Sequence, residues 1–131
     1  MKLLLDTHIW LWAVAEPERL GPRLLDRLRD GATELWLSPI SVWEALLLAE
    51  RGRVRVEGNP DAWVRRMADA IPRREAALTQ EIALESRRLR VAHDDPADRF
   101  LAATARVLDL TLVTADARLL AGTGYATLDN R

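Results

Sequence analysis

Short apolar runs alternate with longer segments of helical periodicity along this chain. The runs at 2–5, 34–38 and 111–113 read as strands, and two further short strands are expected at 75–78 and 125–128. Buried strands of this kind are short and almost continuously apolar. Because strands and helices alternate, the pattern favours parallel strands covered on both sides by helices. It therefore predicts a three-layer α/β fold with a mostly parallel central sheet.

Proline, glycine and small polar residues mark the ends of the expected helices. A Ser, Thr, Asp or Asn just before the first turn, often followed by proline, is typical of a helix start. The expected helices and helical turns cover residues 9–15, 22–31, 38–51, 59–71, 79–90, 96–108 and 116–120. Residues 52–78 are basic and contain one of these helices, and they are the best candidate for a protruding helical arm.

The composition is that of one folded domain spanning residues 1–131, with 49% hydrophobic and 30% charged residues. The absence of cysteine excludes disulfides, thiolate zinc sites and cysteine nucleophiles. No apolar stretch approaches the roughly 18 residues of a membrane helix. The apolar start does not fit a signal peptide, because Asp6 interrupts it and no cleavage site follows. We therefore expect a cytoplasmic protein with no membrane contact.

The net charge of −1 does not indicate a nucleic-acid binder, but the charges are unevenly distributed. Residues 51–90 carry ten basic and six acidic side chains, and all ten basic residues are arginine. Arginine matches phosphate oxygens well. The middle third therefore either faces phosphate or is an ordinary solvated surface, and the sequence leaves both interpretations open.

Four acidic residues that are distant in sequence are predicted to meet at one edge of the sheet. Asp6 directly follows the first strand, and Asp116 follows the strand at 111–113. Glu44 and Asp98 lie near the starts of helices, and the start of a helix that follows a parallel strand lies at the carboxyl edge of the sheet. These four carboxylates are therefore expected to share one site.

Glu44 is unusual for its helix, because Ile40, Leu47 and Leu48 fall on the same face. That apolar stripe is expected to face the core, where an unpaired carboxylate is costly or takes up a proton. A bound cation would resolve this conflict. An arginine from elsewhere in the fold is the alternative partner.

Each of the other acids also has a structural interpretation. Asp98 could be a capping acid of its helix, Asp116 an N-cap and Asp6 a turn residue at the end of a strand. Asp95 fits the N-cap position before Pro96 fully, and we expect it to be structural. Four acids at one edge nevertheless favour metal binding over four separate caps.

Oxygen ligands without a cysteine or histidine cluster suit Mg²⁺ or Mn²⁺ rather than zinc. Such ions activate water and neutralise charge on phosphoryl oxygens. Thr7 and Thr114 lie beside two of the acids and would either orient a water or ligand or serve as turn hydroxyls. The sequence therefore predicts metal-dependent phosphodiester hydrolysis.

The histidines and tryptophans give weaker signals. We expect His8 to pack beside the neighbouring tryptophans and His93 to be exposed in a loop, which does not support a histidine-pair ribonuclease. The tryptophans on predicted core elements are interpreted as core or dimer contacts rather than base-stacking platforms. These are Trp10, Trp12, Trp36 and Trp43.

Four ordered motifs resemble the successive signatures of PIN domains, and in particular those of the VapC toxins of toxin–antitoxin pairs. The motifs are LLLDTH at 3–8, SVWE at 41–44, DPADR at 95–99 and LVTAD at 112–116. No single motif is specific, but the ordered set in so short a chain is. The resemblance spans residues 2–128, and the acidic set shows no departure from it.

The resemblance implies a doubly wound α/β/α fold and Mg²⁺- or Mn²⁺-dependent endoribonuclease activity. It implies an acidic quartet of Asp6, Glu44, Asp98 and Asp116, with Thr114 at the adjacent hydroxyl position. It further implies a homodimer, an antitoxin that wraps the toxin and blocks its site, and a structured target such as transfer or ribosomal RNA.

Three other kinds of protein are the alternatives to this class. A phosphatase with an aspartate nucleophile would usually have a second acid two residues after Asp6, where His8 stands, and a receiver domain needs a late lysine, whereas Lys2 is the only lysine. A non-catalytic interaction module of the same fold is the remaining alternative. In such a module the acids would serve as caps and the arginines would bind a partner.

Overall fold

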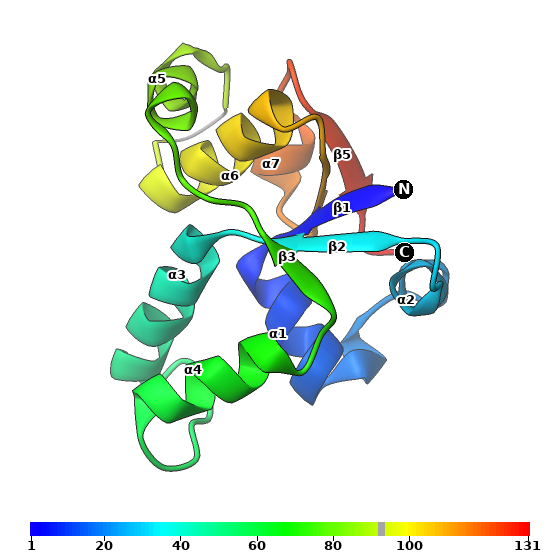
Figure 1. Cartoon of the computed structure of the whole chain (residues 1–131), viewed down its shortest axis with the longest axis vertical. Coiled ribbons are helices and arrows are strands. Elements are labelled where there is room, and N and C mark those ends of the chain that lie inside the picture. Colours follow the sequence, from blue (N-terminus) through cyan, green and yellow to red (C-terminus); the bar gives the residue numbers. More distant parts are fainter. Residues whose placement is uncertain (92–93) are drawn as a thin grey trace.

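A computed structural model of the chain, which describes residues 1–91 and 94–131, has a five-stranded sheet at its centre (Figure 1). All strand pairs are parallel, and the strand order is β3-β2-β1-β4-β5. The strands are β1 (Lys2–Leu5), β2 (Glu34–Leu37), β3 (Arg73–Glu75), β4 (Thr111–Thr114) and β5 (Ala126–Asp129). The predicted α/β fold with a parallel sheet is therefore confirmed.

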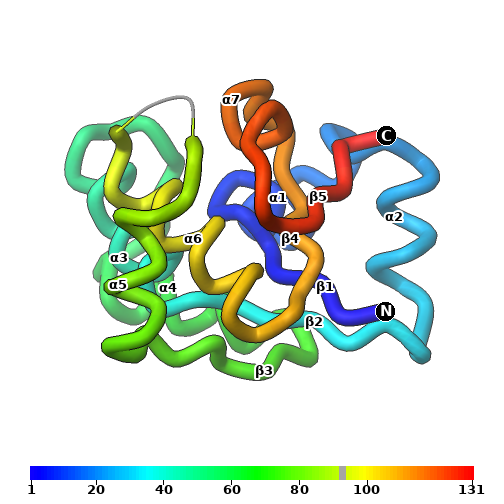
Figure 2. The backbone as a smooth tube through the Cα atoms, turned by 90° about the horizontal axis from the view of Figure 1, so that it is seen from above, coloured from blue at the N-terminus to red at the C-terminus, as the bar shows by residue number. Residues whose placement is uncertain are grey.

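Seven α-helices are found in the described residues, with a short 3₁₀ turn at Pro17–Arg19. They are α1 (Thr7–Ala15), α2 (Pro22–Arg29), α3 (Pro39–Glu50), α4 (Pro60–Asp69), α5 (Gln80–Arg88), α6 (Pro96–Val107) and α7 (Ala117–Leu120). Figure 1 shows α5, α6 and α7 on one side of the sheet and α1 and α4 on the other. Both chain termini lie on the side of α2, away from α3 and α4 (Figure 2).

Strand β1 is buried on both faces, which explains its continuous apolar sequence. Leu3 and Leu5 point into the core cluster that α1 and α4 cover, whereas Leu4 points into the cluster formed with α6 and α7. All three leucines are fully buried. Because successive side chains of a strand point to opposite faces, one run of leucines builds both hydrophobic layers and fixes β1 at the centre.

The helix ends follow the local capping chemistry. Helix α1 begins at Thr7, two residues earlier than predicted, because the Asp6 carboxylate accepts a hydrogen bond from the Thr7 N–H at 2.7 Å. Ser38 and Asp95 cap α3 and α6 in the same manner. Gly52 follows α3 with a φ of +65°, a left-handed conformation that favours glycine.

Residues 52–78 are integrated into the body more closely than the protruding arm that we predicted. Helix α4 buries Trp63, Val64 and Met67 in the core cluster that also contains Leu3 and Leu5, here called the main core cluster. Strand β3 starts at Arg73, earlier than the predicted 75–78, and pairs with β2 as the edge of the sheet. The buried face of α4 could not be recognised from charge alone, because arginines occupy the positions between its apolar residues.

None of the described helices combines the length and apolar character needed to cross a bilayer. The predicted exposure of His93 lies outside the described residues.

Candidate active site

The carboxyl ends of β1 and β4 carry the centre of the candidate site. In this strand order the chain runs from β1 to β2 on one side, while β4 lies on the other side of β1. Parallel α/β sheets bind ligands at such a switch point, because the loops there diverge and leave a crevice. Asp6 follows β1 directly, and Asp116 stands two residues beyond the end of β4.

Thr114 connects these two strand ends. Its hydroxyl donates a hydrogen bond to Asp6 Oδ2 at 2.7 Å and accepts one from the Asp116 N–H at 3.0 Å. With the Thr7 N–H on Oδ1, both oxygens of the Asp6 carboxylate are fixed. Thr114 is fully buried, so its hydroxyl is positioned by the sheet rather than by solvent.

Glu44 and Asp98 reach the same crevice from helices α3 and α6. A cavity of about 510 Å³ is lined by all four predicted acids, together with Asp95 and two arginines. The predicted convergence of Asp6, Glu44, Asp98 and Asp116 on one cleft is therefore observed. On α3, the fully buried residues are Ser41 and Ala45, so Glu44 lies at the margin of the core instead of within the stripe that we predicted.

Asp98 is the most strongly perturbed of these carboxyl groups. Burial, followed by the charges of Asp6, Asp95, Glu44 and Asp116, raises the pKa of Asp98 to about 8. Its residue is 8% exposed, so solvent does little to screen these like charges. The cleft therefore concentrates negative charge where a cation or a proton relieves it.

Burial also raises the pKa values of Asp6 and Glu44. For Asp6, the hydrogen bonds from Thr114 and the Thr7 N–H act in the opposite direction and favour the charged form. For Glu44, the nearby Thr7 hydroxyl lowers the pKa, whereas Asp6 and Asp95 raise it. Within the described residues the buried Thr7 Oγ1 has no hydrogen-bond partner, so Thr7 acts on Glu44 as a nearby dipole.

Arginine contacts this cluster at its rim. Arg118 lies 3.4 Å from Asp116, and its side chain is 59% exposed. In the described part of the chain no arginine forms an ion pair with Glu44, so the arginine that we considered as its alternative partner is not found there.

Two of the acids also have the capping roles that we weighed for them. Asp116 accepts from the Arg118 N–H at 2.8 Å and caps α7. Asp95 accepts from the Ala97 and Asp98 N–H groups, as expected, yet it also lines the cleft. Because a capping aspartate keeps one carboxylate oxygen for other contacts, a cap and a place in the cleft are compatible.

Sequence reasoning missed several residues on the wall of the cleft, among them His8, Trp12 and Arg53. His8 packs against Trp12, with the ring centroids 5.7 Å apart, so the prediction that it lies beside a neighbouring tryptophan is confirmed, although the residue is exposed. Trp10 is fully buried as predicted, whereas Trp43 is 51% exposed and cannot be a core residue. The spacing of His8 and Trp12, one helical turn apart and just after Asp6, was the available signal.

The donor set fits a hard divalent cation. The carboxylates offer oxygen ligands only, and their mutual repulsion in a buried cleft is the condition that such an ion relieves. In the described ranges no group of three or more histidine, cysteine, aspartate or glutamate residues is arranged so that it could hold a metal ion. Mg²⁺ usually keeps several waters and binds through one or two carboxylates, so an open arrangement suits it.

The chain belongs to the PIN domain family, whose model matches residues 3–123. It is 34% identical over 118 residues to "Ribonuclease VapC22" of Mycobacterium tuberculosis, which covers 89% of this chain and 88% of that protein. The residues that the family model matches include Asp6, Glu44, Asp98 and Asp116.

Solved structures share the fold at low sequence identity. VapBC2 from Rickettsia felis, bound to a DNA fragment from its promoter, gives a TM-score of 0.73 at 14% identity and covers 98% of both chains. DNA-bound VapBC from Salmonella typhimurium gives 0.70 at 17% identity, covering 100% of this chain and 99% of that one. These likenesses support the fold assignment.

Proposed function

We propose that this protein is a metal-dependent endoribonuclease and the toxin of a toxin–antitoxin pair in the cytoplasm. The observation that carries the proposal is the cleft in which Asp6, Glu44, Asp98 and Asp116 meet at the end of the parallel sheet. The similarity to a protein named as a ribonuclease supports the reaction type. The toxin–antitoxin complexes among the structural neighbours support a protein antitoxin as partner.

The four acids would hold Mg²⁺ or Mn²⁺. When bound, such an ion supplies Lewis-acid chemistry that activates water and neutralises charge on the phosphate. Thr114 and the Thr7 N–H orient both oxygens of Asp6 before any ligand arrives. Hydrolysis of this kind leaves 5′-phosphate and 3′-hydroxyl ends on RNA. A structured RNA such as transfer or ribosomal RNA is the proposed target.

The test is cleavage of total cellular RNA with the ends mapped, using the wild type, Asp98→Asn and Asp61→Asn. Asp61 is an exposed aspartate on α4 and serves as the matched control. We expect Asp98→Asn to reduce cleavage by about a hundredfold or more, Asp61→Asn to leave it unchanged, and EDTA to stop it. Cleavage that persists in EDTA, or that leaves 2′,3′-cyclic phosphate ends, would overturn the mechanism.

Titration with Mn²⁺ separates this proposal from a non-catalytic interaction module. A saturable site that Asp6→Asn weakens supports the nuclease. If the folded protein shows no saturable site, the acids serve as caps only and the interaction module is the better description.

We further propose that the protein forms a homodimer through helix α3. The helix is apolar along most of its length, yet only Ser41 and Ala45 are fully buried. Trp43 projects from it with 51% of its surface exposed. An exposed indole of this size on a largely apolar helix is typical of a protein interface.

A further inference from the structure

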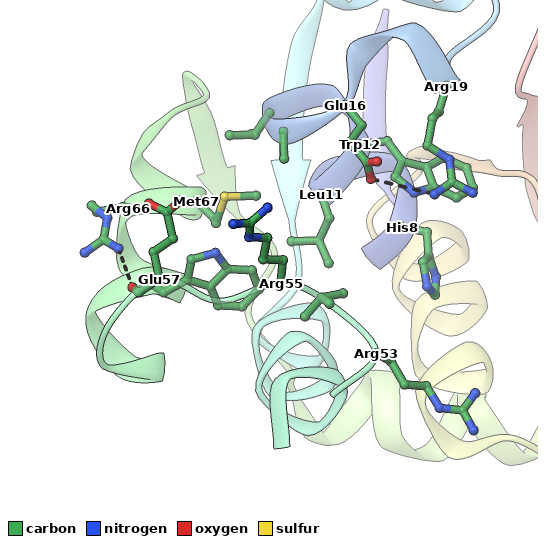
Figure 3. A pocket seen from close by; sticks show the side chains of 14 residues that line it. His8, Leu11, Trp12, Glu16, Arg19, Arg53, Arg55, Glu57, Arg66 and Met67 are labelled. Carbon is green, nitrogen blue, oxygen red and sulfur yellow. Dashed lines mark hydrogen bonds and ion pairs between the residues drawn. The ribbon is translucent and has the colours of Figure 1, made fainter. Parts of the chain in front are cut away.

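A second and larger cavity adjoins the acidic cleft. It has a volume of about 840 Å³ and lies between α1, α4 and the segment after α3 (Figure 3). His8, Trp12 and Arg53 line both this groove and the acidic cleft. A chain molecule with one unit in the cleft can therefore place the adjacent units in the groove.

The groove differs from the cleft in the sign of its charge. Four arginines and two glutamates line it, namely Arg19, Arg53, Arg55, Arg66, Glu16 and Glu57. Arg19 pairs with Glu16 at 3.6 Å, and Arg66 donates to the Glu57 carbonyl oxygen at 3.1 Å. Within the described ranges, Arg53 and Arg55 form no ion pair with any carboxylate.

The sequence of the segment after α3 explains how these two arginines are presented. Val54 and Val56 are half-buried and pack against the main core cluster. Arg53 and Arg55 alternate with them and are exposed. The valines therefore anchor a segment whose guanidinium groups line the groove. Figure 3 shows Arg53 on the side of His8 and Arg55 between Leu11 and Met67.

The wall shared by the two cavities is aromatic. The rings of His8 and Trp12 lie 5.7 Å apart, inclined by 51°. The Arg19 guanidinium covers Trp12 at 4.5 Å from the ring centroid and helps to hold it. The imidazole of His8 remains exposed beside this pair. An exposed ring that packs on a second aromatic ring can stack with an unstacked base. Arginines without ion pairs beside it can bind the phosphates of that strand.

We propose that His8, Trp12 and Arg53 form a subsite for the nucleotide next to the scissile phosphate, in single-stranded RNA. The base stacks on His8, which Trp12 supports, while Arg53 binds the neighbouring phosphate and Arg55 the following one. A base in a duplex is already stacked on its neighbours, so it cannot stack on His8. The inference rests on the proposed nuclease function and adds to it the strand form of the target and the residues that position it.

Binding to a short, mixed-sequence oligoribonucleotide without metal tests the subsite independently of cleavage. Fluorescence anisotropy is measured for the wild type, Arg53→Ala, His8→Ala, His8→Phe and Arg29→Ala, on single-stranded and duplex RNA. Arg29 is an exposed arginine on α2, outside the groove, and is the matched control. Circular dichroism checks that each variant is folded.

We expect Arg53→Ala and His8→Ala to weaken single-strand binding by about fivefold or more, whereas His8→Phe restores it and Arg29→Ala leaves it unchanged. Arg53→Ala should also reduce the salt slope of single-strand binding by about 0.7. Duplex binding should not respond to these substitutions. In cleavage, Arg53→Ala should raise KM with little change in kcat.

Equal effects of Arg53→Ala and Arg29→Ala would overturn the subsite. So would normal RNA binding by Arg53→Ala in a protein that still cleaves RNA, which leaves the nuclease function standing. If Arg53-dependent binding is found without metal-dependent cleavage, the groove is supported and the proposed reaction fails. Binding of an acidic peptide in the groove, with no RNA binding, would overturn the subsite and assign the groove to a protein partner.

Discussion

At the scale of single residues, the acidic cleft couples protonation to stability. Burial and the neighbouring carboxylates raise the pKa of Asp98 in the folded chain from its ordinary value of 3.8 to about 8. The folded state therefore binds more protons than the unfolded state between about pH 4 and pH 8. By linkage, the free energy of unfolding of the metal-free protein falls as the pH rises through this window.

The first prediction follows from this linkage. Asp98→Asn removes the charge that the cleft disfavours, so we expect it to raise the free energy of unfolding of the metal-free protein near pH 8 by more than about 1 kcal/mol. Near pH 4 the gain should disappear, because Asp98 is then protonated in the folded chain. Urea unfolding in EDTA at both pH values measures this difference, and an equal effect at both would contradict it.

The second prediction concerns the hydroxyl that orients Asp6. Thr114→Val keeps the shape of the side chain but removes the hydrogen bond to Oδ2. We expect cleavage to fall by about tenfold or more, since the carboxylate loses its fixed orientation, while Thr114→Ser retains most of the activity. Comparing Mn²⁺ affinity in the two variants checks this. Equal affinity and activity in the valine and serine variants would exclude a positioning role.

At the scale of the elements, α6 is tied to the end of α5 by a buried arginine. Arg99 is 8% exposed and donates to the carbonyl oxygens of Ser86 and Leu89, each at 2.8 Å. These carbonyls lie at the end of α5, where no further helical turn satisfies them. Because Asp98 is adjacent on α6, the same contact fixes the helix that carries an acid of the cleft.

The third prediction tests this connection. We expect Arg99→Met to lower the free energy of unfolding by about 2 kcal/mol or more, because two carbonyls lose a charged donor. Arg65→Ala is the control, since the Arg65 side chain is 75% exposed and pairs with the exposed Asp61 at the surface. Thermal and urea unfolding should show a much larger loss for Arg99→Met, and similar losses in both variants would refute the connection.

At the scale of the whole molecule, the apolar surface of α3 bears on assembly. The fourth prediction is that Trp43→Glu gives a monomer where the wild type is a dimer in sedimentation equilibrium, because a charge cannot be buried at the interface without a partner. Leu84→Glu, at a residue on α5 that is 50% exposed, should not change the mass. A wild type that is monomeric at high concentration would exclude the proposed dimer.

Signals that are local in sequence were sufficient to predict most of the fold. Capping residues and apolar runs placed the strands β1, β2 and β4 and nearly every helix within a few residues, because these signals are local in sequence. The convergence of the four acids was also predicted, from the rule that parallel strands end, and the helices after them begin, at one edge of the sheet. This rule works because a helix that follows a parallel strand must begin at the edge where that strand ends.

Tertiary structure alone decided four features, because each depends on contacts between residues that are distant in sequence. It placed α4 on the body, although its buried residues are interspersed with arginines. It left Trp43 exposed and moved Glu44 to the margin of the core. It also set Arg53 beside His8 and Trp12 at the junction of two cavities, a proximity that no periodicity along the chain encodes.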